Sequence, residues 1–388
     1  MSPRIEHIEA IPLLYSVEGH FKFFENSAGR PSGRPSVLVR MTADDGTVGW
    51  GECVPTPRWS YETLDTVLTT IKLYLAPELI GRDPTDIDGA HAAMNRAIAP
   101  SFSTGQPICK AGIDLALFDL SGKLLGQSAA ARWGRSDRQT VRLSWTLNPR
   151  AISETEDLVR QGLARGYRDF NIKIAPDPTY DIELVRLVRR LAPAAELWVD
   201  ANGGYSEADA LAVAPHLADS GVAFFEQPVP ANRLRSFARL KRQGALPIIM
   251  DEGVVSTADL EEFHALGLLD GLAAKVARVG GVTEARRQIE FLEQEGLIFL
   301  GSGLTDPDLS LSASLALFAA YGLEHAAALN GPQYLTASVL RNPFHAVNGE
   351  LHAPSGPGLG IEIDESAVER LRMTSVPSVP SVPSVPLS

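Results

Sequence analysis

The sequence predicts an α/β fold in which a barrel of alternating strands and helices follows a smaller α+β domain. Five ionisable residues recur at intervals of 27, 26, 25 and 24 residues, and they are Lys173, Asp200, Glu226, Asp251 and Lys275. Each ends a short apolar run of strand length, and an amphipathic stretch of helical length fills each gap. This repeat is typical of a (β/α) barrel, which gathers its functional groups at the carboxyl ends of its strands.

The segment before the barrel is predicted to form an antiparallel sheet followed by helices. Its strands are expected at residues 4–15, 36–41 and 48–52, and its helices at 61–75 and 106–125. Asp45-Gly46 supplies the hairpin turn between the second and third strands, because Asp-Gly accepts the left-handed backbone of such turns. A sheet followed by helices is the order of an α+β domain, which we place at residues 1–135.

The barrel is predicted to span residues 140–335. Its second to sixth strands are expected at 170–174, 197–199, 222–225, 247–250 and 272–276. A seventh strand ends near Gly301, and an eighth lies at 326–330. Residues 336–372 are expected to return to the first domain. The Ser-Val-Pro repeat at 375–388 is expected to be a disordered tail, because proline at every third position forbids helix.

Composition and charge limit the function classes. A length of 388 residues with 45% hydrophobic content suits a globular enzyme, and a net charge of -12 argues against a nucleic-acid surface. The apolar stretches are too interrupted to span a bilayer, and the first residues lack the apolar core of a signal peptide. Cys53 and Cys109 stand outside any paired-spacing motif, which suits a reducing compartment. We therefore expect a cytoplasmic protein whose partner is a small molecule rather than nucleic acid or membrane.

Three carboxylates at the ends of consecutive strands predict a metal site. Asp200, Glu226 and Asp251 would repel one another at the barrel mouth unless a cation neutralised them. Because ligation by oxygen alone favours a hard divalent ion, Mg²⁺ is the expected metal and Mn²⁺ the alternative. Any single acidic residue in such a place could instead cap the next helix. The lysines that end the two outer strands favour the metal site, because buried charges need partners.

Motifs around these residues resemble the enolase superfamily, and within it the muconate-lactonizing-enzyme subgroup of the mandelate racemase/muconate lactonizing enzyme family. The resemblance reaches to about residue 370. It rests on Ile172-Lys173, Asp200-Ala201-Asn202-Gly203-Gly204-Tyr205, Phe225-Glu226-Gln227-Pro228, Met250-Asp251-Glu252, and Lys275 ahead of Arg278-Val279-Gly280-Gly281. Supporting segments are Gly49-Trp50-Gly51-Glu52, residues 111–119 and Pro357-Gly358-Leu359-Gly360. The resemblance implies a modified TIM barrel, (β/α)7β, with an α+β capping domain that the C-terminal segment completes, and a homo-oligomeric assembly.

The resemblance also implies an enzyme that abstracts the α-proton of a small carboxylate. The three carboxylates would hold the Mg²⁺ that stabilises the enediolate, while Lys173 and Lys275 would face each other as catalytic acid and base. The family shows Lys-x-Lys at the end of the second strand, whereas this chain has Asn171 in place of the first lysine. Asn171 is therefore expected to contact the substrate as an uncharged donor, and other groups are expected to help receive the substrate carboxylate.

Two opposed lysines permit several reactions. We expect racemisation or epimerisation of an amino acid or amino-acid derivative, with dehydration, a lyase reaction, or cycloisomerisation as alternatives. A sugar acid is disfavoured because no histidine ends the seventh strand. A dipeptide is disfavoured because the eighth strand reads Ala328-Leu329-Asn330 where dipeptide epimerases carry Asp-x-Asp. A carboxylate-binding barrel without activity is the non-enzyme alternative, against which the paired lysines argue.

Substrate contacts are expected from the barrel mouth and from two lid loops, at about residues 17–34 and 54–61. Aromatic side chains would give the lid its apolar faces. Asp306 and Asp308, which follow the seventh strand, could receive a cationic nitrogen, although acidic residues there also suit the start of a helix. The expected substrate-binding residues are Asn171, Asn202, Phe24, Trp59, Asp306, Asp308 and Asn330.

Overall fold

The computed structural model describes residues 2–25, 32–101, 104–135 and 140–373. The predicted Ser-Val-Pro tail and part of the first lid loop therefore lie outside the described residues. None of the described helices is both long and apolar enough to cross a membrane.

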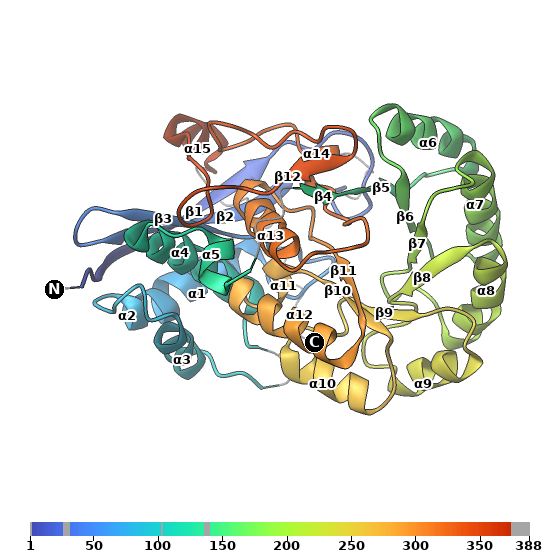
Figure 1. Cartoon of the computed structure of the whole chain (residues 1–388), viewed down its shortest axis with the longest axis horizontal. Coiled ribbons are helices and arrows are strands. Elements are labelled where there is room, and N and C mark those ends of the chain that lie inside the picture. Colours follow the sequence, from blue (N-terminus) through green and yellow to red (C-terminus); the bar gives the residue numbers. More distant parts are fainter. Residues whose placement is uncertain (1, 26–31, 102–103, 136–139, 374–388) are drawn as a thin grey trace, which may run out of the picture.

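A curled sheet of seven parallel strands forms the centre of the larger part of the molecule (Figure 1). Its strands are β5 (Ser144–Leu147), β6 (Asp169–Lys173), β7 (Leu197–Asp200), β8 (Val222–Glu226), β9 (Ile248–Met250), β10 (Gly271–Ala274) and β11 (Ile298–Gly301). Each strand pairs with the next one along the chain, so the sheet runs from β5 to β11 in sequence order. The strands are short apolar runs because both of their faces are buried. The predicted strand positions and the α/β barrel class are confirmed.

The eighth strand closes the sheet but is reduced to isolated bridges. Ala327 forms a parallel bridge to Leu143, just before β5, and Ala328 forms one to Ser302, just after β11. The amide of Ala328 donates to the carbonyl of Gly301 at 2.8 Å, and the amide of Ser144 donates to the carbonyl of Ala327 at 2.9 Å. The chain at 326–330 thus joins the two edges of the sheet and completes the barrel.

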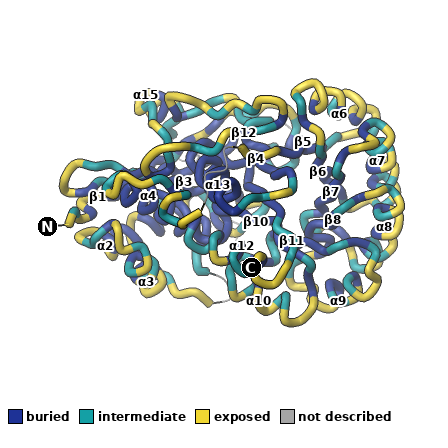
Figure 2. Tube along the Cα trace, in the orientation of Figure 1, coloured by how far each residue is buried: buried dark blue, intermediate teal, exposed yellow. Residues whose placement is uncertain are grey.

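Helices cover the outside of the barrel (Figure 1). They are α6 (Thr155–Ala164), α7 (Pro178–Leu191), α8 (Glu207–Asp219), α9 (Leu234–Gln243), α10 (Thr257–Ala265), α11 (Val276–Val279), α12 (Val282–Glu295) and α13 (Asp308–Ala320), with a short 3-10 turn at Ile152–Glu154. Several begin at a capping side chain, as where Ser206 accepts a hydrogen bond from the amide of Asp209. Helix α13 is buried along its whole length, because it lies between the barrel and the N-terminal domain (Figure 2).

The N-terminal domain is a three-stranded antiparallel sheet covered by helices. The strands are β1 (Ile5–Tyr15), β2 (Arg34–Ala43) and β3 (Val48–Cys53), and the helices are α1 (Leu64–Thr70), a π-helical segment (Ile71–Leu75), α2 (Ala76–Leu79), α3 (Ile87–Ala97), α4 (Pro107–Leu125) and α5 (Ala129–Trp133). Helix α4 lies directly on β3, where Gly51 permits the approach. A Cβ atom at Gly51 would lie 2.0 Å from the carbonyl oxygen of Gly112.

The C-terminal segment runs back along the N-terminal sheet. After α14 (Gly331–Tyr334), β12 (Glu350–His352) pairs with β4 (Thr140–Arg142), and α15 (Glu365–Leu371) packs on β1. Arg372 forms an antiparallel bridge to Leu13 of β1. Val339, Leu340 and Val368 share one buried cluster with β1 and β2. These contacts support the proposed completion of the capping domain by residues 336–372.

Candidate active site

The barrel strands place their inward-facing side chains in two successive layers. The lower layer is an apolar cluster made of Trp198, Phe224, Ile249, Ala273, Leu300 and Ala328. Because side chains two residues apart lie on the same face of a strand, the next inward positions are Asp200, Glu226, Asp251, Lys275, Ser302 and Asn330. The polar layer therefore lies directly above an apolar floor, at the carboxyl ends of the strands.

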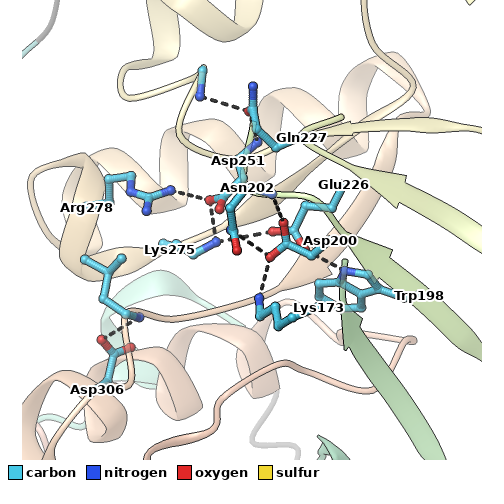
Figure 3. Close-up of polar contacts among 12 residues, drawn as sticks. Lys173, Trp198, Asp200, Asn202, Glu226, Gln227, Asp251, Lys275, Arg278 and Asp306 are labelled. Carbon is cyan, nitrogen blue, oxygen red and sulfur yellow. Dashed lines mark hydrogen bonds and ion pairs between the residues drawn. The ribbon is translucent and has the colours of Figure 1, made fainter. Parts of the chain in front are cut away.

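The three predicted metal ligands converge. Asp200, Glu226 and Asp251 are buried, and one carboxylate oxygen from each lies within 4.8 Å of the others. Neighbouring groups orient them: the backbone amide of Asn202 donates to Asp200 at 2.8 Å, and the indole Nε1 of Trp198 donates to Glu226 at 2.5 Å (Figure 3). Sequence reasoning expected Asn202 as a substrate contact, but its side-chain amide also donates to Asp200, at 3.0 Å.

The chain turns sharply where it leaves the strands that carry these ligands. Asn202 after β7 and Gln227 after β8 have φ values of 45° and 36°, in the left-handed region that few side chains adopt. The side chain of Gln227 stabilises the next turn, because its Oε1 accepts from the amides of Asp251 and Gly253 at 3.0 and 3.1 Å. Unusual backbone thus accompanies the ligands at the barrel mouth.

Cations from three positions surround the carboxylates (Figure 3). Lys173 of β6 is paired with Asp200, and Lys275, which follows β10, is paired with Asp251 and lies 3.4 Å from Glu226. Arg278 is also paired with Asp251. Sequence reasoning noted Arg278 only as part of a motif. Its short spacing from Lys275, within one helical turn, was the signal that could have placed it here.

Burial and mutual repulsion perturb these groups. Burial raises the pKa of Glu226 to about 8, and the charge of Asp200 adds to the effect. Burial would also raise the pKa of Asp251, but Arg278 and Lys275 hold it below its usual range. Burial opposes the ammonium form of Lys173, yet the surrounding carboxylates raise its pKa. The site thus disfavours the ionised form of Glu226, while the neighbouring cations favour the ionised form of Asp251.

The residues present fit a divalent cation. Every convergent ligand is a carboxylate oxygen, the donor type that Mg²⁺ prefers. Among the described residues, Oδ2 of Asp251 is buried and accepts no hydrogen bond. A buried carboxylate oxygen without a donor is costly, and a bound cation would satisfy it.

The lid covers the cations with aromatic rings. Trp59 lies over the site, with Nζ of Lys173 at 5.7 Å, Nζ of Lys275 at 5.4 Å and Cζ of Arg278 at 5.0 Å from its ring centroid. The ring of Phe23 stacks on Trp59 with a centroid distance of 4.5 Å. The structure thus brings Trp59 to the site, as the sequence analysis expected.

The expected contact at Phe24 is not brought to the site. Phe24 is buried beside Phe21, and the guanidinium of Arg34 lies 5.2 Å from its ring centroid. Adjacent side chains in this turn point in different directions, so its neighbour Phe23 takes the place over Trp59. Sequence alone could not distinguish two consecutive phenylalanines.

Arg34 holds the lid loop in place, and the sequence analysis missed it. Its guanidinium is fully buried and donates to the carbonyls of Val54 at 2.9 Å, Pro55 at 2.8 Å and Leu304 at 3.2 Å. A fourth bond goes to the carbonyl of Pro35 at 2.7 Å. Arg34 therefore ties the second lid loop to the loop that follows β11.

Two acidic residues that were expected at the site accept hydrogen bonds from other parts of the chain instead. The carboxylate of Asp308 accepts from Oγ of Ser338 at 2.8 Å and from the amide of Val339 at 2.7 Å, so it anchors the C-terminal segment. Asp306 accepts from the amide of Leu304 at 3.1 Å and lies apart from the triad (Figure 3). The structure does not bring Asp308 to the triad, because the first turn of α13 directs it toward the seam between the domains.

The two remaining expected residues line the barrel interior. Asn171 is level with Thr146 and Trp198, one layer below the ligands, and neither atom of its side-chain amide has a partner among the described residues. Asn330 is in the polar layer, where its Nδ2 donates to Oγ1 of Thr146 at 3.4 Å and its Oδ1 lacks a partner among the described residues. Oδ1 of Asn330 is therefore available to a molecule bound in the mouth, whereas Asn171 is buried one layer below the ligands.

Comparisons with known proteins give one consistent result. Residues 154–367 match the family described as enolase C-terminal domain-like, and residues 21–132 match the mandelate racemase / muconate lactonizing enzyme N-terminal domain. A chloromuconate cycloisomerase of Cupriavidus necator is 31% identical over 341 residues, which cover 86% of this chain and 90% of that protein. Muconate cycloisomerase 1 of Rhodococcus opacus is 28% identical over 345 residues, covering 87% and 90%.

Solved structures give the same picture. The crystal structure of 2-chloromuconate cycloisomerase from Rhodococcus opacus 1CP superimposes with a TM-score of 0.87 at 28% identity, covering 96% of this chain and 100% of that one. Muconate lactonizing enzyme from Pseudomonas fluorescens, complexed with muconolactone, gives 0.89 at 27% identity, with the same coverage. The expectation of an amino-acid racemase or epimerase is therefore wrong, because these relatives are cycloisomerases. Sequence reasoning weighed cycloisomerisation only as an alternative, since a pair of lysines serves either reaction.

Proposed function

Because the chain belongs to the mandelate racemase / muconate lactonizing enzyme family of the enolase superfamily, in its muconate-lactonizing-enzyme subgroup, we propose that it is a cycloisomerase of muconate or a substituted muconate. The observation that carries this proposal is the buried carboxylate triad flanked by Lys173 and Lys275 in a chain similar to cycloisomerases over most of its length. We propose Mg²⁺ as the metal, held by Asp200, Glu226 and Asp251.

The reaction rearranges one molecule without loss of atoms. A carboxylate oxygen at one end of the substrate adds to the double bond conjugated with the carboxylate at the other end, which closes a lactone ring. The π electrons of that double bond move toward the second carboxylate, and the α-carbon is then protonated. When bound, the divalent cation stabilises the negative charge that develops on this carboxylate.

Lys173 is the proposed proton donor. Its ammonium is paired with one carboxylate, that of Asp200, whereas Lys275 contacts both Glu226 and Asp251. The less constrained lysine is better able to move to the α-carbon, while Lys275 contributes fixed positive charge beside the developing enolate. Trp59 and Phe23 cover these groups and exclude water from the protonation step.

The proposal is tested by incubating the purified protein with muconate and chloromuconates in the presence of Mg²⁺. Mass spectrometry should show a product of unchanged mass in H₂O, and NMR in D₂O should show one deuterium at the α-carbon. Lys173→Ala should lower turnover by at least two orders of magnitude, whereas Lys72→Ala, at an exposed lysine of the segment Ile71–Leu75, should not. Chelation of the metal should also stop the reaction. A product that has lost water, or no isomer from any muconate, would contradict the proposal.

We also propose the cytoplasm as the compartment of this enzyme and a homo-oligomer as its assembly. The first proposal is supported by Cys53 and Cys109, which are both free and buried.

A further inference from the structure

On β6, the interior position below Lys173 carries no positive charge, because it is occupied by Asn171. Asn171 and Lys173 point to the same interior face, but Asn171 is level with Trp198, whereas Lys173 is level with Asp200. A long cationic side chain at position 171 could extend up into the ligand layer. The short, neutral amide of Asn171 stays below it and is fully buried.

A cation from the lid lies on the same side. Lys22 interacts electrostatically with Asp200, Lys173, Glu252 and Asp181, which are groups at the ends of β6, β7 and β9 and on the adjoining helix α7. Its Nζ lies 5.3 Å from the ring centroid of Phe23, the residue that stacks on Trp59. Lys22 therefore borders the aromatic lid that covers Lys173 and Lys275.

Lys22 has no carboxylate partner of its own. No ion pair or hydrogen bond joins its Nζ to any of the described residues. Asp181, the carboxylate of α7 that acts electrostatically on Lys22, already accepts from the amide of Ala175 at 2.8 Å and from the hydroxyl of Tyr205 at 2.5 Å. A second donor on the lid is also unused, because the buried Nε1 of Trp59 lacks an acceptor in the described part of the chain. The lid therefore carries a half-buried ammonium and a buried N–H that both lack acceptors, which favours an anionic ligand there.

We propose that Lys22 is a specificity-determining residue, which binds the ring-closing carboxylate of a dicarboxylate substrate at the lid while the conjugated carboxylate faces the triad. This inference rests on the proposed function, because it assigns the two ends of one substrate to two places in the same site. The lid then selects dianions. Lys22 supplies a positive charge that the neutral side chain of Asn171 on β6 does not supply.

Equilibrium binding tests this assignment without turnover. The unreactive six-carbon dicarboxylate adipate and the matching monocarboxylate hexanoate are titrated into the Mg²⁺-loaded protein, with calorimetry as the readout. The wild-type protein should bind adipate more tightly than hexanoate. Lys22→Gln should weaken adipate binding by on the order of ten- to a hundredfold and leave hexanoate within about threefold, because only the dianion loses a charged partner. Lys22→Arg, which keeps the charge, should retain most of the preference, and Lys72→Gln should change neither affinity.

The outcomes separate the two proposals. If Lys22→Gln weakens the binding of both ligands equally, or of neither, Lys22 does not bind the carboxylate at the lid and the inference is wrong. If adipate binding depends on Lys22 but no muconate is converted, the inference stands and the cycloisomerase assignment fails. If muconate is converted and its KM is unchanged by Lys22→Gln, the cycloisomerase assignment stands and the inference fails.

Discussion

Replacing Arg34 by methionine should destabilise the protein strongly and loosen the lid. The substitution keeps the apolar stem but removes a buried guanidinium that satisfies four backbone carbonyls, at donor distances of 2.7 to 3.2 Å. Adding the full value of four charge-assisted bonds would overstate the effect, because the bonds share one side chain. Breaking a buried, hydrogen-bonded charge costs about 3–5 kcal/mol, and we adopt that range.

Arg40 provides the matched control on the same strand. It lies on β2 with its guanidinium 5.5 Å from the ring of Trp50, and its Nε has no hydrogen-bond partner among the described residues. Arg40 is partly buried, and Arg40→Met should therefore cost only about 0.5–1 kcal/mol, the value of a cation–π contact near the surface.

Urea unfolding, followed by circular dichroism, measures both variants against the wild-type protein. The difference between them should be at least about 2 kcal/mol, a large part of a total stability of roughly 5–15 kcal/mol. Arg34→Met should also raise KM, because Val54 and Pro55 of the lid loop lose their anchor. Equal losses of stability in the two variants would refute the reasoning, since the carbonyl contacts of Arg34 would then add nothing to the stability that Arg40 contributes without them.

Three further predictions concern the metal, pH and packing. Asp251→Asn should abolish turnover and weaken Mg²⁺ binding at least tenfold by calorimetry, with an unchanged circular dichroism spectrum, and full activity after exhaustive chelation would contradict it. Burial opposes protonation of His91, but its 2.6 Å hydrogen bond to Asp114 raises its pKa, so the stability it contributes is present below about pH 6.5 and is lost as pH rises through the folded pKa. Between pH 6 and pH 8, the free energy of unfolding measured in urea should therefore fall less for His91→Gln than for the wild-type protein. An identical fall would show that the His91–Asp114 pair does not cause the pH dependence. Gly51→Ala should destabilise the protein by about 1–3 kcal/mol or more in the same assay, because its Cβ would meet the carbonyl of Gly112 at 2.0 Å, and a neutral effect would show that α4 can shift away from β3.

The part of the site that could be predicted from sequence is local to single strands. A strand places residues two apart on one face, so the apolar run ending at Phe225 already fixes where Glu226 lies relative to its neighbours in the sheet. The same regularity located the closing strand near Ala327, although bridges rather than a full ladder form there. Spacing along the chain thus carried enough information for the barrel and its ligand layer.

The remaining features depend on contacts between distant segments, for which the sequence holds no periodic signal. Arg34 meets Leu304 across 270 positions, and nothing near either residue indicates the other. Asp308 lies next to the mouth in sequence, yet contacts made by Ser338 and Val339 decide where its carboxylate points. The reaction itself was mispredicted for a related reason, because two opposed lysines are compatible with either proton exchange or ring closure.

The closure of the barrel also bears on the order in which the protein is synthesised and assembled. Lys173 to Lys275 form a continuous stretch of neighbouring strands, so the catalytic groups can come together through contacts of low sequence separation. The contacts that fix the lid join residues up to 270 positions apart, and Leu304 and the bridge at Ala327 leave the ribosome after all five of the catalytic residues. The five catalytic residues therefore precede this anchor of the lid in the order of synthesis, so Arg34 cannot fix the lid loop until the chain has reached Leu304.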